Sequence, residues 1–415
     1  MLRFLAPRCV ARAAAVVSGA ALVGAGGSYL QPPSPAFSLS ARAPSAIAAA
    51  SAPSFVRVVS YNVLCSHLCE PDHFIACNPN DLAPSTRVER VKRALQPHID
   101  LGAVICLQEV SVQWIGELTP FFEEAGYTLM TGSYGKEFNN YMGVSLAWPR
   151  ARFEAEACDV TRAAETKPWP RDMSKVEKPK VGRLLATWQA LRGIWWRQSA
   201  DTGPAFNRPP MDVAKEVERR ANMLVSARLR CRTSGKRFAV STYHMPCLFG
   251  SDPAVQVMVC HAALAARHAL ALADGDPCIL AGDFNFDPQS APYMLLTRGE
   301  LDDKHPHQPP ARAADPWRPT MPMALQSAYV AALGHEPDFT NLAVTKFQPD
   351  SSFCGTLDYI FLGDATSKDK WKVNQVRVLP TRDEVLPVTR SYPTATEPSD
   401  HVAIWCDLDL VSGKG

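Results

Sequence analysis

The stretch "LAGDFNFDPQS", residues 280–290, decides the fold class and marks the candidate site. Its apolar run ends in Asp283 and Asn285, which are two residues apart and therefore lie on the same face of an extended chain. A carboxylate and an amide on one face can align a water molecule and grip a phosphate oxygen. Because the same pattern also caps ordinary turns, the rest of the chain has to decide between the two interpretations.

Short apolar runs alternate with helix-like segments along the chain from Phe55 onward. The runs predicted as strands are 102–110, 142–148, 222–230, 237–244, 278–285, 356–362 and 402–410. Residues 85–99 predict a helix that begins at a Ser/Thr cap and stops at Pro97, and residues 255–275 predict a long helix that ends at Gly275. The alternation indicates an α/β fold with its site at the strand ends.

Composition excludes few classes of protein. The chain has 415 residues, of which 47% are hydrophobic and 20% charged, as in ordinary globular proteins. A net charge of +2 provides no global field that would attract nucleic acid, so any such attraction must come from local patches. The 12 cysteines are too scattered for a disulfide scaffold, and we expect them to be mostly reduced.

Residues 1–54 differ in composition from the rest and predict a targeting leader. They contain no Asp, Glu or Lys, and four arginines lie in Ala-, Ser- and Pro-rich sequence. We expect an organellar destination, the mitochondrion before the plastid, while the uncharged run 13–30 leaves secretory entry open. Its many Ala and Gly residues suit a spanning helix poorly, so we expect no stable membrane insertion. Residues 55–415 are the predicted catalytic domain.

A basic, Trp-rich segment at about 163–215 interrupts this domain. It contains Trp169, Trp188, Trp195 and Trp196 among many Lys and Arg residues. Interleaved basic and aromatic residues can follow a nucleic-acid strand by charge and stacking. The interpretation that we favour is a helical insertion whose tryptophans pack on the domain while its charges face water.

Further polar groups end other predicted strands. Glu109 follows "AVICLQ", His244 ends "FAVSTYH", Asp358 lies in "GTLDYIF", and Asp400 and His401 lie in "EPSDHVAIW". Each alone has an ordinary explanation, as a helix N-terminal acid or a core histidine. Several together are hard to explain by packing, because buried charges are costly unless they are paired or bind a metal.

The order of these motifs resembles that of the endonuclease/exonuclease/phosphatase superfamily. The motifs are "SYNVL" with Asn62, "LQEV", His244, "GDFN", "LDYIF" and "SDH", and the resemblance covers about residues 55–412. The segments "PQSAPYMLLTRGEL" and "LQSAYVAALGHEPDFTN" are most similar to the branch of deadenylases, nocturnin and Angel proteins. The resemblance implies a four-layer α/β sandwich, in which two mixed sheets pack face to face between helices.

The resemblance also implies catalytic roles. Asp283 would orient or deprotonate the attacking water, and Asn285 would position that water or a phosphate oxygen. His244 and His401 would stabilise charge on the pentavalent phosphorus, and Asp358 would fix the orientation of His401. These roles suit phosphoryl transfer, which needs mainly positioning and charge neutralisation.

For the metal, the resemblance implies that Glu109 holds Mg²⁺, with Mn²⁺ as a possible substitute, and that Asn62 and Asp400 lie close to it. The loop beyond Asn62 contains Cys65, His67, Cys69, His73 and Cys77, a density that would also suit zinc. We favour partly buried free thiols there, because the Cys-x₃-Cys spacing is unusual for a zinc site.

For the substrate, the resemblance implies that Phe353 and a proline hold adenine between them. Pro253 is the candidate, and Pro246 competes with it because the loop after His244 is longer than the family's. Lys136 is a candidate phosphate contact, with an ordinary solvated lysine as the alternative.

Three functions are compatible with the sequence. The first is a Mg²⁺-dependent 3′→5′ exoribonuclease or poly(A)-specific deadenylase that acts on RNA in an organelle. The second is hydrolysis of a small adenine nucleotide, such as the 2′-phosphate of NADP or a 2′,5′-linked oligoadenylate. The third is a non-catalytic RNA-binding protein, and the intact set of polar strand ends argues against it.

Overall fold

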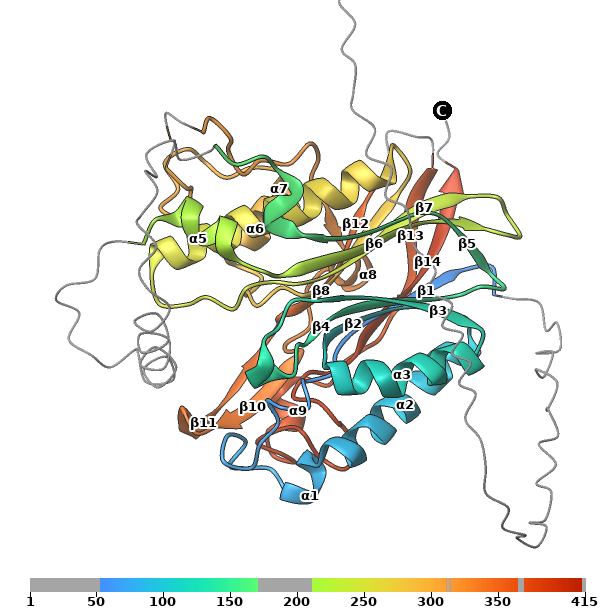
Figure 1. The fold of residues 1–415 in the computed structure, drawn as a ribbon, viewed down its shortest axis with the longest axis vertical. Helices are drawn as coiled ribbons and strands as arrows, with labels where there is room; N and C mark the ends of the chain where they lie inside the picture. Colours follow the sequence, from blue (N-terminus) through green and yellow to red (C-terminus); the bar gives the residue numbers. More distant parts are fainter. Residues whose placement is uncertain (1–52, 171–210, 311, 313–314, 365–368, 413–415) are drawn as a thin grey trace, which may run out of the picture. The chain divides into compact units, whose positions relative to one another are not determined.

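The computed structural model describes residues 53–170, 211–310, 312, 315–364 and 369–412, whose strands form two six-stranded sheets and one two-stranded ribbon (Figure 1). The first sheet has the order β13 (Asp369–Val376), β14 (Ile404–Ser412), β1 (Val56–Asn62), β2 (Val104–Val110), β4 (Gly143–Pro149) and β3 (Tyr127–Ser133). The second has the order β5 (Phe153–Arg162), β6 (Met223–Cys231), β7 (Arg237–His244), β8 (Cys278–Asp283), β12 (Asp358–Gly363) and β9 (Gln326–Ser327). The ribbon pairs β10 (Asn341–Thr345) with β11 (Gln348–Gly355).

Both sheets are mixed, and each contains one parallel pair. β1 runs parallel to β2, β7 runs parallel to β8, and the other pairings are antiparallel. In a parallel pair the carboxyl ends of two strands reach the same edge of the sheet. The polar residues that end these four strands are therefore brought together in pairs.

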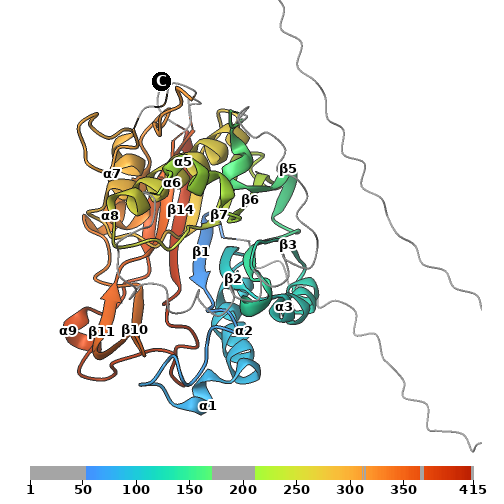
Figure 2. The same cartoon turned by 60° about the vertical axis from the view of Figure 1, so that its left-hand side comes forward.

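Helices cover the outer faces of the sandwich (Figures 1 and 2). α2 (Pro84–Asp100) and α3 (Val112–Glu124) lie against the first sheet, and α6 (Asp252–Ala273) and α7 (Ala291–Arg298) lie against the second. Shorter helices are α1 (Pro79–Leu82), α5 (Val213–Arg219), α8 (Ala328–Leu333) and α9 (Arg382–Val385), with 3₁₀ turns η1 (Glu137–Asn139) and η2 (Ala163–Thr166). The predicted four-layer α/β sandwich is confirmed.

The period of two along each strand divides its side chains between two cores. Val58 of β1 and Ile279 of β8 face each other's sheet in the central core, whereas Val59 packs on the helices α2 and α3 and Leu280 packs on α6. The side chains two and four residues after Val58 and Ile279 face the same way as these two. This alternation leads to Asn62 at the end of β1 and to Asp283 at the end of β8. Asn62 and Asp283 are thus the last members of the inner faces.

The helix predicted over 85–99 is longer than expected, and its capping was predicted wrongly. α2 runs from Pro84 to Asp100 with Pro97 inside it, and its N-cap is Ala83, which supplies no side-chain hydrogen bond. Proline at position 97 removes one amide donor near the end of the helix. Buried Leu95 and Ile99 hold the helix on the first sheet on both sides of that position, so packing outweighs the lost hydrogen bond.

α6 is long and apolar enough to cross a membrane by length and composition alone. Thirteen of its 22 residues are buried, and its alanines pack on the outer face of the second sheet. Core packing therefore explains its apolar character. The helix ends at Ala273 because Asp274 takes up a left-handed conformation. Its last residue is therefore two residues before the predicted stop at Gly275.

Two predicted segments lie wholly or partly outside the described residues. The leader 1–54 lies outside except for its last two residues, and within the insertion 163–215 the tryptophans at 188, 195 and 196 also lie outside. Trp169 is described: its indole N–H donates to the carbonyl of Ala164 at 2.6 Å, and it packs beside Val217 and Cys260. For this one tryptophan the structure agrees with packing on the domain.

Candidate active site

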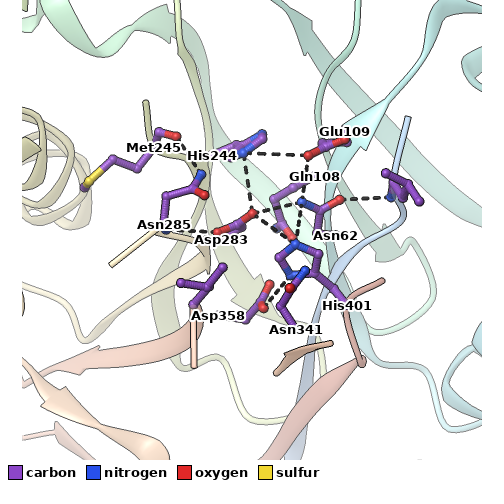
Figure 3. A network of polar contacts seen from close by, with 12 residues as sticks. Asn62, Gln108, Glu109, His244, Met245, Asp283, Asn285, Asn341, Asp358 and His401 are labelled. Atoms are coloured by element: carbon purple, nitrogen blue, oxygen red, sulfur yellow. Dashed lines mark hydrogen bonds and ion pairs between the residues drawn. The ribbon is translucent and has the colours of Figure 1, made fainter. Parts of the chain in front are cut away.

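Asn62 and Asp283 meet across the open end of the sandwich, one from each sheet. The Asn62 side-chain amide donates to Asp283 Oδ2 at 2.9 Å and to Glu109 Oε1 at 3.0 Å (Figure 3). All three are largely withdrawn from solvent, with Asn62 and Asp283 buried completely. One amide therefore holds two carboxylates at a fixed separation.

The strands β1 and β8 end in the same local structure. Asn62 Oδ1 accepts from the Leu64 amide and Asp283 Oδ1 accepts from the Asn285 amide, each at 2.9 Å. Leu64 and Asn285 have φ values of 54° and 51°, in the left-handed region that non-glycine residues rarely occupy. The Asn285 side chain then donates to the Met245 carbonyl at 3.0 Å, which keeps it at the rim of the cluster. Such outliers gather at functional sites.

Glu109 reaches the site because β2 is irregular. By the period of two its side chain would face the helices, but the pairing of β2 with β4 shifts register between Leu107 and Val110, and Glu109 has φ of 60°. The residue turns inward, where its second carboxylate oxygen accepts the Cys65 amide at 3.0 Å. A strained, bulged strand end that carries an acid is typical of a binding or catalytic position.

His244 lies beside Asp283 because β7 and β8 pair in parallel with these two residues in register. A Cβ atom on Gly282 would collide with the Tyr243 carbonyl, so only glycine allows this close approach. His244 Nε2 lies 3.4 Å from Asp283 Oδ2 and 3.9 Å from Glu109 Oε1. Its Nδ1 is 2.5 Å from the Tyr134 hydroxyl, a partner that no motif in the sequence indicated.

His401 and Asp358 form a buried pair on the other side of Asp283. His401 Nδ1 lies 2.7 Å from Asp358 Oδ2, and Nε2 lies 3.6 Å from Asp283 Oδ2 (Figure 3). Burial by itself lowers the pKa of His401, but the carboxylates of Asp358, Asp283 and Asp400 outweigh it and raise that pKa well above 6.5. Burial raises the pKa of Asp358 to about 6, against the attraction of His401. At neutral pH the pair is an imidazolium and a carboxylate.

Asp400 lies at the edge of this arrangement. Its carboxylate accepts the Asn341 amide at 3.0 Å, and burial raises its pKa above the usual value. Among the described residues, two groups of converging donors lie within 4.8 Å, one formed by Glu109, His244 and Asp283 and the other by Asp283, Asp358 and His401. Neither group includes Asp400.

The donor set fits a divalent cation. Three carboxylates, those of Glu109, Asp283 and Asp358, belong to the two groups of converging donors, and the buried carboxylate of Asp400 lies at their edge. His401 is held as a cation by its acidic neighbours. Buried negative charge in such excess is costly unless a cation balances it. Carboxylate oxygens are the ligands that Mg²⁺ prefers, with Mn²⁺ as a compatible alternative.

The structure distributes the three predicted substrate residues differently. Phe353 on β11 is 39% exposed. Its ring lies beside Gly355, and so does the carboxylate of Asp287, which is two residues beyond Asn285. Lys136 is exposed on the loop between β3 and β4 that also carries Tyr134. Pro253 is in the first turn of α6 and lines a separate cavity of about 360 Å³ with Trp169 and Trp317, so it is not brought to the cluster.

The cysteines that suggested zinc do not converge. Cys65 Sγ donates to the Asn139 carbonyl and Cys77 Sγ to the Ser391 hydroxyl, while Cys69 packs in a small apolar cluster. Burial raises the pKa of Cys65 to about 11 and that of Cys69 to about 12, which keeps both thiols protonated. The described cysteines are free thiols, in agreement with the predicted reduced interior.

Two buried residues that sequence reasoning missed support the site. The Gln108 amide donates to Thr242 at 2.9 Å and so joins the two sheets one layer beneath the cluster. Arg87 of α2 is fully buried and donates to the carbonyls of Val63, Leu64 and Pro398 at 2.5–2.7 Å. It fixes the two loops that carry Asn62 and His401. An arginine in an amphipathic helix carries no signal of burial in the sequence.

Comparison with known proteins agrees with this geometry. The model of the family described as "Endonuclease/Exonuclease/phosphatase family" matches residues 59–401, which is most of the chain. Similar curated proteins include 2′,5′-phosphodiesterase 12 of Mus musculus, 24% identical over 366 residues, which are 86% of this chain and 52% of that protein. The CCR4-Not complex 3′-5′-exoribonuclease subunit Ccr4 of Aspergillus niger is 26% identical over 392 residues, which are 87% and 52% of the two chains. The chain thus spans about half the length of these relatives.

Solved structures show the same fold at low identity. ANGEL2, described as a 2′,3′-cyclic phosphatase in complex with adenosine-2′,3′-vanadate, superposes with a TM-score of 0.60 at 18% identity, covering 86% of this chain and 96% of that one. The human Nocturnin catalytic domain superposes with a TM-score of 0.50 at 17% identity, covering 86% and 95%. The predicted resemblance to this branch is confirmed.

Proposed function

Because the chain belongs to the endonuclease/exonuclease/phosphatase family, we propose that it is a Mg²⁺-dependent phosphodiesterase that shortens RNA from the 3′ end and prefers adenine-rich tails. One observation carries the proposal: Asn62, His244 and His401 converge on Asp283 at the open end of the sandwich, and Glu109 lies against Asn62 and His244. The exoribonuclease named among its relatives supports the choice of RNA.

Asp283 is the group placed to act on water. Its Oδ1 accepts the Asn285 amide, whereas Oδ2, which accepts the Asn62 amide and lies near both histidines, is the oxygen that would accept a proton or orient an attacking water. The Asn285 side chain, anchored on the Met245 carbonyl, closes this side of the space and would position the same water or a phosphate oxygen. A general base within hydrogen-bond reach of its water accelerates such a reaction by roughly 10²–10⁴-fold.

The two histidines provide hydrogen-bond donors for the phosphate, and His401 also provides positive charge. His401 is held as an imidazolium by Asp358, so its Nε2–H can donate to an oxygen that gains charge in the transition state. His244, whose Nδ1 is occupied by Tyr134, presents Nε2 from the opposite side of Asp283. Neither histidine needs to move during the reaction, because each is fixed through its second nitrogen.

Glu109 is the residue that would hold the cation, with the Asn62 amide fixing its carboxylate and Asp283 and Asp400 adding negative charge. A bound divalent cation would neutralise phosphate charge and lower the pKa of its water. The Cys65 amide and the Asn62 amide each donate to one carboxylate oxygen of Glu109, and these two hydrogen bonds fix its position. The site is therefore preorganised for binding.

A labelled RNA tests the proposal. The full chain is incubated with Mg²⁺ and a 5′-labelled RNA that ends in an oligo(A) tail, beside the near-isosteric variant Glu109→Gln. We expect a ladder of products shortened from the 3′ end with the wild type and intact RNA with the variant. Intact RNA with both proteins, at a protein concentration in excess of RNA, contradicts the proposal. Tails of other bases then measure the preference for adenine.

A small adenine nucleotide is the second candidate substrate, favoured by the similarity to 2′,5′-phosphodiesterase 12. In 2′,5′-oligoadenylate and in NADP the attacked phosphate is bonded to a 2′ oxygen. Its hydrolysis requires the same water activation and charge neutralisation. Release of AMP from 2′,5′-oligoadenylate, or of phosphate from NADP, is measured with the same two proteins. Turnover of these compounds with intact RNA would select this candidate over the first.

A further inference from the structure

The loop from Tyr134 to Met142, between β3 and β4, displays two aromatic rings to solvent. Phe138 is 65% exposed and Tyr141 is 50% exposed. Isolated exposed apolar side chains are common, but two aromatic rings close together on one short loop are not explained by packing. The loop also carries the exposed Lys136.

Hydrogen bonds define the conformation of the loop. The amides of Tyr134 and Gly135 both donate to the Met142 carbonyl, and the Tyr141 amide donates to the Lys136 carbonyl at 2.9 Å. Buried Asn139 forms the base of the loop and accepts the Lys136 amide at 2.6 Å. A loop held by this many hydrogen bonds presents its exposed rings in fixed positions.

The backbone of this loop is strained at two consecutive residues. Asn140 and Tyr141 are consecutive non-glycine residues with φ of 45° and 49°. Single residues in the left-handed region are uncommon, and two in succession persist only where the surrounding structure imposes them. Here the imposed turn directs the segment after η1 back into β4 and leaves both rings outside. Such outliers concentrate at binding sites.

Direct hydrogen bonds join the loop to the active site. The Tyr134 hydroxyl lies 2.5 Å from His244 Nδ1. The Asn139 carbonyl accepts from Cys65 Sγ at 3.0 Å, and the Cys65 amide donates to Glu109. The segment that carries the rings therefore contacts His244 directly and Glu109 through Cys65. This places the rings at the margin of the catalytic cluster.

We infer that Phe138 and Tyr141 are a stacking platform for bases of a single-stranded polynucleotide whose scissile phosphate lies at the cluster, with Lys136 facing its backbone. Every base has a flat apolar face, so stacking on aromatic rings binds a strand with little regard to sequence. A lysine beside the rings supplies the charge that a phosphate backbone requires. A single nucleotide bound at the cluster has only one base, so it would leave the rings of Phe138 and Tyr141 without bases to stack on.

This inference rests on the proposed function and extends it, because it names an extended single strand as the substrate. Phe249, which is 66% exposed, lies on the loop that follows His244. The ring of Phe353 lies beside Gly355, as does the carboxylate of Asp287. Exposed aromatic rings are thus found on three segments that border the cluster. Phe138 and Tyr141 are the pair that lies three residues apart on one hydrogen-bonded loop.

Binding of RNA tests the platform independently of catalysis. The full chain and the double variant Phe138→Leu/Tyr141→Leu are titrated against a fluorescently labelled single-stranded oligo(A) of about 10 nucleotides, a length within the span of known single-strand sites. Leucine keeps an apolar surface and removes the flat ring, and Phe138→Trp keeps a ring and serves as the matched control. We expect Kd to rise roughly tenfold for each ring lost and to stay near the wild-type value in the control.

The outcomes separate the two proposals. An unchanged Kd in the double variant overturns the platform, and so does an equal loss of kcat/KM on the oligonucleotide and on the dinucleotide ApA. A loss confined to the KM for the oligonucleotide, with ApA turnover unchanged, supports it and shows that the variant is folded. RNA that binds through the platform and is never cleaved contradicts the proposed exoribonuclease instead.

Discussion

The active-site end of the sandwich and the helix layer outside the second sheet each bury a histidine, and the two environments shift its pKa in opposite directions. His401 is surrounded by carboxylates, which raise its pKa well above 6.5. His261 of α6 is completely buried among apolar groups with the Tyr243 hydroxyl 2.8 Å from its Nδ1, and burial lowers its pKa to about 3. One is a cation at neutral pH and the other is neutral.

This difference shows that depth of burial does not decide the charge of a side chain. Withdrawal from water disfavours the charged form of both histidines. At His401 the nearby carboxylates reverse the effect. At His261 Arg220 and Arg162 act in the same direction as desolvation, and Glu216, which opposes them, is outweighed. The charge of a buried histidine in this fold is therefore set by its acidic partners, and each partner can be removed in turn.

The largest effect is expected for Asp283→Asn, because Oδ2 of this carboxylate lies near both site histidines. Asparagine keeps the shape but cannot accept a proton from water or attract the imidazolium. We expect kcat to fall by roughly 10³-fold on a phosphodiester substrate, measured at saturating Mg²⁺. Asp287→Asn, which changes an exposed acid just beyond the motif, is the matched control and should leave kcat near the wild-type value. Equal losses in the two variants would contradict this role for Asp283.

A smaller effect is expected for Asp358→Asn, which makes the surroundings of His401 more like those of His261. Without that carboxylate the raised pKa of His401 falls, so the imidazolium is lost at a lower pH than in the wild type. We expect kcat to fall by roughly 10²-fold at pH 8 and to recover in part as the pH is lowered. The profile of kcat against pH measures this, and a uniform loss at every pH would show that Asp358 only orients the ring.

The smallest effect is on stability and concerns His261. Its folded pKa of about 3 lies below the unfolded value near 6.5, so the unfolded state binds the proton first and stability falls as pH drops below 6.5. We expect this one group to cost about 2 kcal/mol of unfolding free energy between pH 7.5 and pH 5. Urea unfolding of Tyr243→Phe/His261→Leu should show that much less acid sensitivity than Tyr243→Phe alone. Identical sensitivity in the two variants would contradict the assignment.

Seven of the strands and most of the site could be predicted from the sequence because their signals are local. β7 was predicted over 237–244 with the bounds that the structure has, whereas β8 begins at the predicted Cys278 and ends at Asp283, two residues before the predicted end. The polar residues that end apolar runs, among them Asn62, Glu109 and His401, do lie together. An apolar strand has few reasons to end in a buried acid or histidine, which is why these positions could be identified.

Long-range partners could not be predicted in the same way. Tyr134 contacts His244 across 110 residues of sequence, and Arg87 contacts Pro398 across 311. Pro253 was chosen by its place after the strand-end histidine, but the loop is long enough for α6 to begin first and to carry it to another cavity. Only the path of the loop in space decides which proline borders the site.

The sequence by itself determined which residues end strands, their order along the chain and the family to which they point. These properties follow from local periodicity, because side chains two residues apart share a face of a strand wherever that strand lies. Tertiary structure alone decided that Glu109 turns inward at a bulge, that His401 is charged while His261 is not, and that Phe138 and Tyr141 stand exposed beside the site. Those outcomes depend on register, desolvation and charges from distant segments, which are set only when the two sheets close on each other.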